Sequence, residues 1–167
     1  IAKAEIYLYQ FLYIGRCVRS LQSPVDSLNA NVKPNRMSTS PLAPRHIFVP
    51  ALPRMRARIS HAVVFGDTVT VSGMVGRDPV TGNALTGVAA QTRQVLDYLG
   101  LVLAEAGSGF DCVAKTGCFL RSMADFDAFN AVWESYFPDN PPARICVQAE
   151  LGPGFDVEID AIAWVRR

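Results

Sequence analysis

Near its C-terminus the chain contains the stretch Val157-Glu158-Ile159-Asp160-Ala161-Ile162-Ala163, which is rich in residues that favour β-strands. We expect a strand over residues 155–166, paired with a strand over 144–150, because Leu151-Gly152-Pro153-Gly154 is typical of a turn between strands. Glu158 lies among apolar residues of this strand, and a carboxylate in such a place is costly unless it has a partner or a task.

Upstream of this pair, the spacing of apolar residues and the positions of Gly and Pro predict five further elements. These are strands over residues 60–65 and 68–72, a helix over 88–106, a strand over 113–120 and a helix over 122–137. The order β-β-α-β-α-β-β predicts an α+β fold with a single mixed sheet and two helices packed on one face. The last strands carry apolar residues on both faces, so we expect copies of the chain to associate.

The composition is that of one globular domain. The chain has 167 residues, of which 50% are hydrophobic and 19% are charged, and its net charge is +1. This balance requires neither a nucleic-acid nor a membrane partner. The four cysteines include no C-x-x-C pair and there are only two histidines, so we expect reduced thiols, a cytoplasmic location and no metal site.

Residues 1–46 are predicted to form an N-terminal extension or arm, and residues 47–167 the folded domain. The first methionine is Met37, and the residues that follow it are typical of an ordinary chain start. We therefore interpret residues 1–36 as sequence added by a vector or by an upstream-extended reading frame; the alternative is a native extension. The apolar run over residues 6–14 is too short to span a bilayer.

Arg144 and Glu158 are the candidate catalytic residues. The planar guanidinium of Arg144 suits a substrate carboxylate, because two parallel N–H donors match two oxygens; the alternative is an exposed ion pair. Glu158 could orient or deprotonate a water molecule if burial raises its pKa. The alternative is a solvated acidic face, since Asp156 and Asp160 have the same parity in the strand.

Two other groups of residues have both a functional and a structural interpretation. Gly73, which follows Ser72, either lets a ligand approach the backbone or permits a bend. Arg54, Arg56 and Arg58 alternate, and we interpret them as a charged edge that prevents strand-to-strand aggregation. Contact with an anion or with RNA is the alternative, although no aromatic residues stand between them for base stacking.

Seven short stretches, taken together and in this order, resemble the reactive intermediate deaminases (the Rid, YjgF or L-PSP family) over about residues 59–166. The stretches are Ser60-His61-Ala62-Val63, Val71-Ser72-Gly73, Asp78-Pro79-Val80-Thr81-Gly82, Ala89-Ala90-Gln91-Thr92-Arg93-Gln94, Asp125-Phe126 with Asn130, Pro142-Ala143-Arg144-Ile145-Cys146-Val147, and Glu158-Ile159-Asp160-Ala161-Ile162-Ala163.

This resemblance implies a chorismate-mutase-like fold and a homotrimer with clefts between its subunits. It also implies cofactor-independent hydrolysis of reactive 2-enamino and 2-imino acids to 2-keto acids and ammonium. Arg144 would bind the substrate carboxylate and Glu158 would position water. Residues lining the substrate would be Ile145, Cys146, Ser72, Gly73 and Asn130, with Cys146 as pocket wall and oxidation target rather than covalent catalyst.

The sequence departs from the family pattern before the Ser-His-Ala stretch. Many deaminase-competent members have Gly-Pro-Tyr there, whereas this chain has Ala57-Arg58-Ile59 and so lacks the tyrosine hydroxyl. Pro142 stands where an aromatic residue is frequent in the family. Two alternatives to the deaminase therefore stay open: a non-catalytic trimer that binds or senses small carboxylates, and an RNA-cleaving protein of the L-PSP type.

Overall fold

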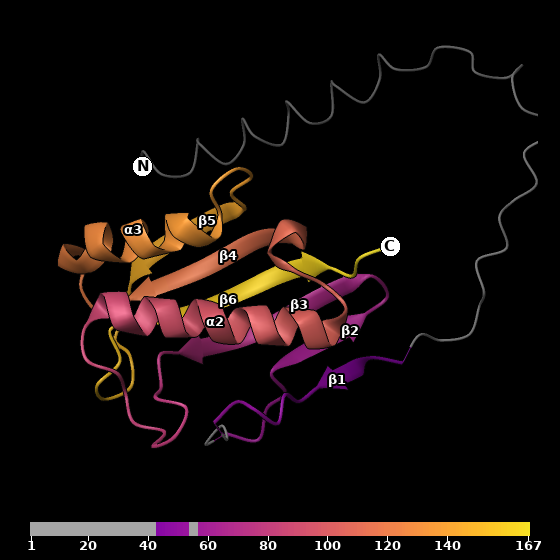
Figure 1. Cartoon of the computed structure of the whole chain (residues 1–167), viewed down its shortest axis with the longest axis horizontal. Coiled ribbons are helices and arrows are strands. Elements are labelled where there is room, and N and C mark those ends of the chain that lie inside the picture. The colour runs from indigo at the N-terminus through magenta and orange to yellow at the C-terminus, as the bar shows by residue number, and fades with distance from the viewer. Residues whose placement is uncertain (1–42, 54–56) are drawn as a thin grey trace, which may run out of the picture. The chain divides into compact units, whose positions relative to one another are not determined.

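The structure is a computed structural model that describes residues 43–53 and 57–167 (Figure 1). The interpretation of residues 1–36 and the predicted roles of Arg54 and Arg56 lie outside the described residues. The predicted start of the domain, residue 47, falls within the first strand.

Six strands, two helices and two short 3₁₀ turns make up the described part. In chain order they are β1 (Arg45–Ile47), β2 (Ala62–Phe65), β3 (Thr68–Val75), α2 (Val88–Ala106), η1 (Phe110–Cys112), β4 (Val113–Leu120), η2 (Met123–Asp125), α3 (Phe126–Tyr136), β5 (Ala143–Gln148) and β6 (Val157–Trp164). The predicted α+β order is confirmed, with β1 as an additional strand.

The strands form one mixed sheet in the order β1-β2-β3-β6-β4-β5. β4 and β5 are parallel, and the other neighbours are antiparallel. Both α2 and α3 lie on the same face of this sheet (Figure 1). The predicted architecture of two helices on one face is therefore confirmed, and β5 is an edge strand whose outer side is unpaired among the described residues.

The central strand β6 divides its residues between two environments. The odd-numbered residues face the helices and are at most 1% exposed: Val157, Ile159, Ala161 and Ala163. The even-numbered residues face away from the helices: Glu158, Asp160, Ile162 and Trp164. We call this second surface, with the residues of β2 to β5 paired beside it, the open face of the sheet.

The helix-covered face holds the core. Helix α2 contributes a stripe of residues that are at most 1% exposed, namely Val95, Leu96, Leu99, Val102 and Leu103. It ends at Gly107, whose φ of 82° allows its own N–H and that of Ser108 to bond to the carbonyls of Ala104 and Leu103. No helix in the part of the chain that the structure describes is long and apolar enough to cross a membrane.

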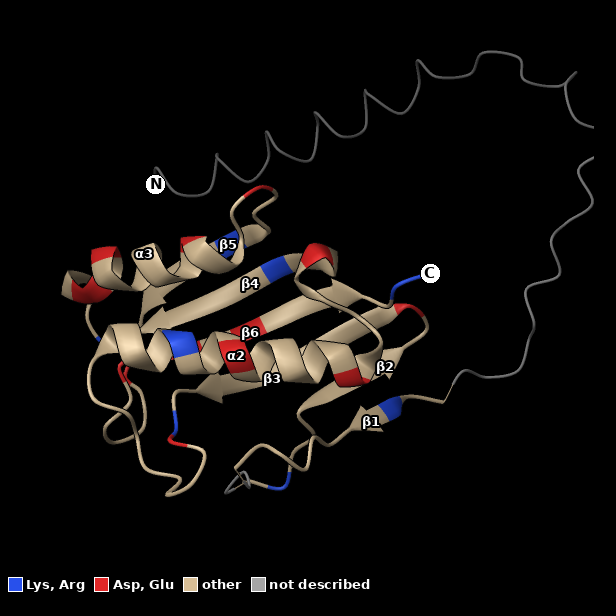
Figure 2. Cartoon of the chain, in the orientation of Figure 1, with Lys and Arg blue, Asp and Glu red and all other residues tan. Residues whose placement is uncertain are grey.

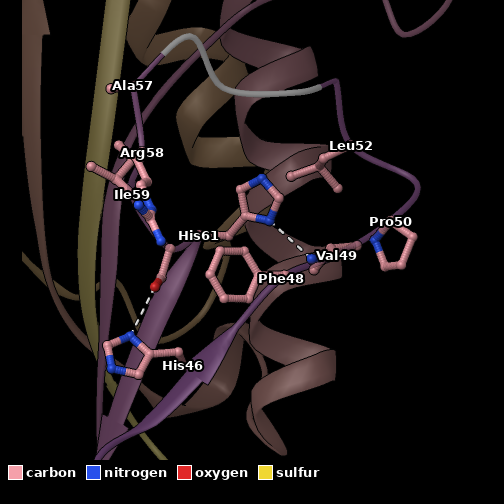
Figure 3. A pocket seen from close by; sticks show the side chains of 10 residues that line it. His46, Phe48, Val49, Pro50, Leu52, Ala57, Arg58, Ile59 and His61 are labelled. Carbon is pink, nitrogen blue, oxygen red and sulfur yellow. Dashed lines mark hydrogen bonds between the residues drawn. The ribbon is translucent and has the colours of Figure 1, made fainter.

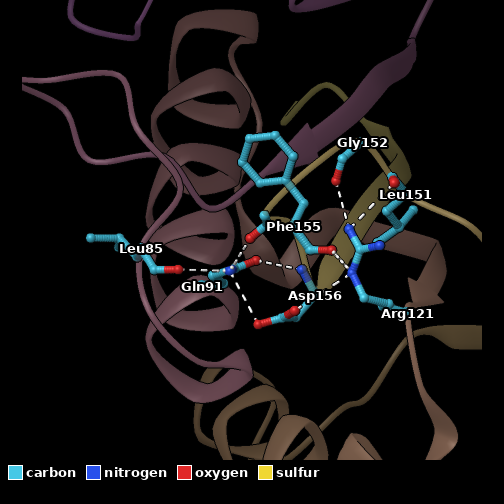
Figure 4. A network of polar contacts seen from close by, with 8 residues as sticks. Leu85, Gln91, Arg121, Leu151, Gly152, Phe155 and Asp156 are labelled. Carbon is cyan, nitrogen blue, oxygen red and sulfur yellow. Dashed lines mark hydrogen bonds and ion pairs between the residues drawn. The ribbon is translucent and has the colours of Figure 1, made fainter.

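A buried polar network fixes the turn that leads into β6 (Figure 4). Gln91 of α2 is fully buried, donates to the carbonyls of Leu85 (2.7 Å) and Gly154 (2.9 Å), and accepts from the backbone N–H of Asp156 (2.8 Å). Arg121 donates from Nε to the Phe155 carbonyl (2.6 Å) and from Nη2 to the Gly152 carbonyl (2.6 Å). The network therefore holds the start of β6, two residues before Glu158.

Replacing Gln91 by Leu is expected to lower the free energy of unfolding by about 3 kcal/mol, because two part-buried hydrogen bonds to carbonyls and one to a backbone N–H are lost. Urea unfolding measures this change. Gln94→Leu, the same substitution three positions further along α2 at a half-buried site, is the control. Equal losses for the two variants would show that the network has no special part in stability.

Candidate functional site

The open face carries large apolar side chains that the rest of the described chain leaves exposed. Five large hydrophobic side chains on it are between 38% and 60% exposed: Phe65, Ile145, Val147, Ile162 and Trp164. The register places them on one face. Ile145 and Val147 pair through β4 with Asp160 and Glu158 of β6, and Phe65 pairs through β3 with Trp164. A surface of this kind is typical of a face that another protein surface covers.

Arg144 lies on the opposite, helix-covered face. It pairs with Thr116 of β4, which is fully buried. Its Nη1 donates to Asn130 Oδ1 of α3 at 2.8 Å. Its Cζ lies 4.3 Å from the centroid of the Trp133 ring. The structure therefore brings the side chains of Arg144 and Asn130 into direct contact.

Cys146 is a protonated thiol in the wall of this region. It pairs with the buried Cys118 across the parallel strands and packs against the core. Burial raises the pKa of the Cys146 thiol, and this effect outweighs the opposing influence of the Arg144 guanidinium. Burial also raises the pKa of Cys118, to about 12. Neither thiol has the thiolate character that a nucleophile needs.

Glu158 lies on the open face beside a β-bulge. Val71 pairs with Ala161 and Met74 with Ile159, so Ser72 and Gly73 together oppose one residue of β6. A Cβ atom at Gly73 would overlap Oε1 of Glu158. Within this chain, the group that lies close to the Gly73 backbone is thus the Glu158 carboxylate. Ser72 is tied to the neighbouring segment, because its Oγ donates to the Ser60 carbonyl at 2.8 Å.

A second carboxylate, Asp160, stands beside Glu158 on the open face. Its Oδ1 accepts from the backbone N–H of Gly117 at 2.9 Å, and a Cβ at Gly117 would collide with it. Burial raises the pKa of the Glu158 carboxyl group, and the negative charge of Asp160 adds to the rise. Glu158 is half-buried, so it differs from the fully solvated acid of the alternative interpretation.

Arg144 and Glu158 lie on opposite faces of the sheet. Thr116, the partner of Arg144, is an even-numbered residue of β4, whereas Phe119, the partner of Glu158, is odd-numbered. Paired residues share a face and successive residues alternate. The register therefore excludes a cleft within one chain that is lined by both side chains.

Two hollows adjoin this region of the sheet. A depression of about 300 Å³ on the open face is lined by residues that include Lys115, Phe119, Ile145 and Asp160. A pocket of about 730 Å³ lies beside β1 and the segment over residues 57–61 (Figure 3).

The larger pocket contains Ile59 and both histidines. Ile59 is 46% exposed. His61 Nδ1 accepts from the backbone N–H of Val49 at 2.9 Å, and burial lowers the pKa of His61, which keeps it neutral near pH 7. His46 Nδ1 lies 2.9 Å from Ser60 Oγ (Figure 3). The pocket is connected to the bulge, since Ser60 is also the residue that accepts from Ser72.

Comparison with known proteins agrees with this architecture. Residues 50–165 match the profile of the family described as endoribonuclease L-PSP. The chain belongs to the Rid (YjgF/L-PSP) family. A rat Rid-family protein named 2-iminobutanoate/2-iminopropanoate deaminase is 42% identical over 106 residues, which cover 62% of this chain and 77% of the rat protein.

Solved Rid structures have the same fold. The YjgF gene product of E. coli superimposes with a TM-score of 0.69 at 31% identity, covering 73% of this chain and 99% of the bacterial chain. RidA from an Antarctic Psychrobacter species gives a TM-score of 0.70 at 32% identity, covering 72% and 99%.

Sequence reasoning missed three features of this Rid chain's site. Trp133 lies within the helix predicted over residues 122–137, but nothing in the sequence indicates that Arg144 lies over its ring. The glycines beside the two acids were equally hidden. Gly117 pairs with Asp160, whereas Gly73 lies in the bulge and against the Glu158 carboxylate, and both contacts depend on the register. The signal that the sequence offered was a glycine within or directly after each of two predicted strands, which turn out to be the two neighbours of the strand that carries the acids.

Gly73→Ala is expected to displace the Glu158 carboxylate, because the new methyl group would occupy its position. We expect kcat of any reaction that depends on Glu158 to fall about 10-fold or more, since small misplacements of a catalytic group are costly. Gly66→Ala is a comparison that only strains a turn, because nothing lies within 4 Å of its added Cβ. Full activity of Gly73→Ala would show that the position of Glu158 is unimportant.

The raised pKa of Glu158 predicts a pH-dependent stability. Between the ordinary pKa of 4.5 and the raised pKa of Glu158, the folded Rid chain binds more protons than the unfolded chain. The contribution of Glu158 to the free energy of unfolding therefore falls as pH rises through that window. Glu158→Gln should therefore unfold at a higher temperature than the wild type at about pH 7, and the difference should vanish below about pH 4. Thermal unfolding at both pH values tests this, with the exposed Glu150→Gln as control.

Proposed function

We propose that this protein hydrolyses reactive 2-enamino and 2-imino acids to 2-keto acids and ammonium, without a cofactor, at sites between copies of the chain. The observation that carries the proposal is that one sheet bears Arg144, with donors free among the described residues, on one face and Glu158, a half-buried carboxylate of raised pKa, on the other. The deaminase name of relatives about 40% identical supports the same reaction.

In the proposed mechanism, Arg144 binds the substrate carboxylate and fixes its position. Glu158 accepts a proton from a water molecule as that water attacks C2 of the imine. That proton then passes to the imine nitrogen and gives a carbinolamine. The hydroxyl proton of the carbinolamine follows to the amine, the C2–O bond becomes a carbonyl as the C2–N bond breaks, and the 2-keto acid and ammonia leave. The ammonia takes up a proton from the solvent to become ammonium. Backbone groups at Ile145–Cys146 and Ser72–Gly73 would stabilise the charge that develops on the way.

The site is proposed to be complete only in an oligomer. Within one chain the register separates Arg144 from Glu158, so a substrate held by Arg144 would meet Glu158 of the partner subunit. The exposed apolar side chains of the open face and the unpaired edge of β5 suit such an association. A homotrimer with three equivalent clefts is the assembly that we expect from the family resemblance.

An assay with freshly formed imine tests this function. An amino acid oxidase acting on alanine generates 2-iminopropanoate, and semicarbazide traps the part that has not yet been hydrolysed. We expect the protein to reduce the trapped amount in proportion to its concentration. An unchanged rate of decay would contradict the hydrolase.

Ile59 favours a second candidate, a non-catalytic trimer that binds or senses small carboxylates. The position at which we expect the family tyrosine holds an exposed side chain without a hydroxyl group. Binding of keto acids without any acceleration of imine decay would support this candidate.

RNA cleavage has less support. Lys and Arg are scattered over separate elements and interleaved with Asp and Glu in the described part (Figure 2). Salt-sensitive RNA binding that disappears on changing Arg54, Arg56 and Arg58 would revive this third reading.

A further inference from the structure

Three aromatic side chains of α3 surround the guanidinium of Arg144. Phe126, Phe129 and Trp133 follow at intervals of three and four residues, so they share one face of the helix. Arg144 Cζ lies 4.3 Å from the Trp133 centroid and 5.6 Å from the centroids of both phenylalanines. Trp133 is only 5% exposed, so its ring is held by packing and offers a fixed surface for the cation.

Asn130 orients the same guanidinium from the side. Its Oδ1 accepts from Arg144 Nη1 at 2.8 Å, and its Nδ2 donates to Glu134 Oε1 at 2.5 Å. The contact with Glu134 determines which way the amide points, because a carboxylate accepts only from the amide nitrogen. Asn130 therefore presents its oxygen, and not its nitrogen, to Arg144.

The remaining edge of the guanidinium is open. Among residues 43–53 and 57–167, neither Nε nor Nη2 of Arg144 has a hydrogen-bond partner, and no carboxylate forms an ion pair with this side chain. A half-buried cation without an anion, stacked on one side and tethered on another, has two parallel donors left for a planar carboxylate.

The indole N–H of Trp133 supports the importance of the ring. It is buried and has no acceptor in the described part of the chain, which is an energetic cost of having tryptophan at this position. A phenylalanine would fill much of the same space without that cost. It would, however, present a weaker π face to the cation, since tryptophan is the strongest of the aromatic partners.

We propose that Trp133 is a positioning residue which, together with Asn130, holds Arg144 so that its Nε–Nη2 edge captures the substrate carboxylate. The inference rests on the proposed function in that the ligand is a 2-keto or 2-imino acid. It goes further by naming the residue that gives Arg144 its orientation and the edge that the ligand uses.

Titration with 2-oxobutanoate and with its methyl ester, followed by calorimetry, tests the inference without any turnover. Trp133→Leu should weaken binding of the acid about 3- to 30-fold, the range that corresponds to loss of a cation–π contact, and leave the weak binding of the ester unchanged. Trp133→Phe should lose less affinity and be at least as stable as the wild type. Val132→Ala, at a buried residue of α3 that forms neither a hydrogen bond nor a cation–π contact with Arg144, should change neither affinity.

Asn130→Ala keeps the experiment decisive if Trp133→Leu fails to fold, because Asn130 is only half-buried; it should also weaken binding of the acid and not of the ester. Equal loss for acid and ester, or no loss for either variant, would overturn the inference. Imine turnover that persists alongside unaltered acid binding in both variants would leave the hydrolase standing and refute the positioning role. Trp133-dependent acid binding without turnover would refute the hydrolase and leave the positioning role intact.

Discussion

Arg144→Ala is expected to lower kcat/KM for 2-iminopropanoate by about 10²–10³-fold, because the substrate loses a charge-assisted, two-point contact that fixes its position. Arg144→Lys should recover only a small part of this loss. An ammonium group keeps the charge, but it cannot stack flat on Trp133 or present two parallel donors. Initial rates of imine decay over a range of substrate concentrations measure both effects.

The control for this prediction is Arg93→Ala, which removes an exposed arginine from α2. We expect its kinetics to match those of the wild type, since surface charges away from the site contribute little. If Arg144→Ala hydrolysed the imine at the wild-type rate, the substrate would have to bind elsewhere, and the pocket around Ile59 would become the first alternative.

Glu158→Gln is expected to lower kcat by about 10²–10⁴-fold with little change in KM, because the amide cannot accept the proton of the attacking water. The side chain keeps its size, so the space opposite Gly73 stays filled and the fold is preserved. Rapid-mixing measurement of keto acid formation at saturating imine separates this loss from any change in binding.

Asp160→Asn is the informative comparison for Glu158→Gln. Removing the neighbouring charge takes away one cause of the raised pKa of Glu158, so activity should extend to lower pH while most of kcat remains. Lys115 is the other charged residue that lines the hollow beside Asp160. Equal losses of kcat in the two variants would mean that Asp160, and not Glu158 alone, handles the proton.

Much of the fold could be predicted from local patterns. The apolar residues of α2 recur at helical spacing, and Gly107 is the kind of residue that ends a helix in the left-handed conformation. The structure has the helix over the predicted residues and ends it at Gly107. β1 could not be predicted, because three residues show no alternation, and its formation depends on pairing with β2. β1 is therefore a strand because of its pairing with β2 and not because of its local sequence.

The faces of the site residues could not be predicted either. Arg144 and Glu158 are both even-numbered, which suggests a common face if their strands were neighbours. The predicted pairing of these two strands with each other is wrong, because β4 lies between them. β5 is parallel to β4 and its even-numbered residues pair with even-numbered ones, whereas β6 is antiparallel to β4 and Glu158 pairs with the odd-numbered Phe119. Register is therefore a property of the whole sheet, and it turns these two side chains in opposite directions.

Mixing two inactive variants tests the shared site most directly. Arg144→Ala and Glu158→Gln chains, carrying different tags and produced together in equal amounts, should assemble at random. A site that takes Arg144 from one copy and Glu158 of the partner subunit is then intact in about a quarter of cases, so about a quarter of wild-type imine hydrolysis should return. Activity no higher than the sum of the two parents would contradict a site built between subunits.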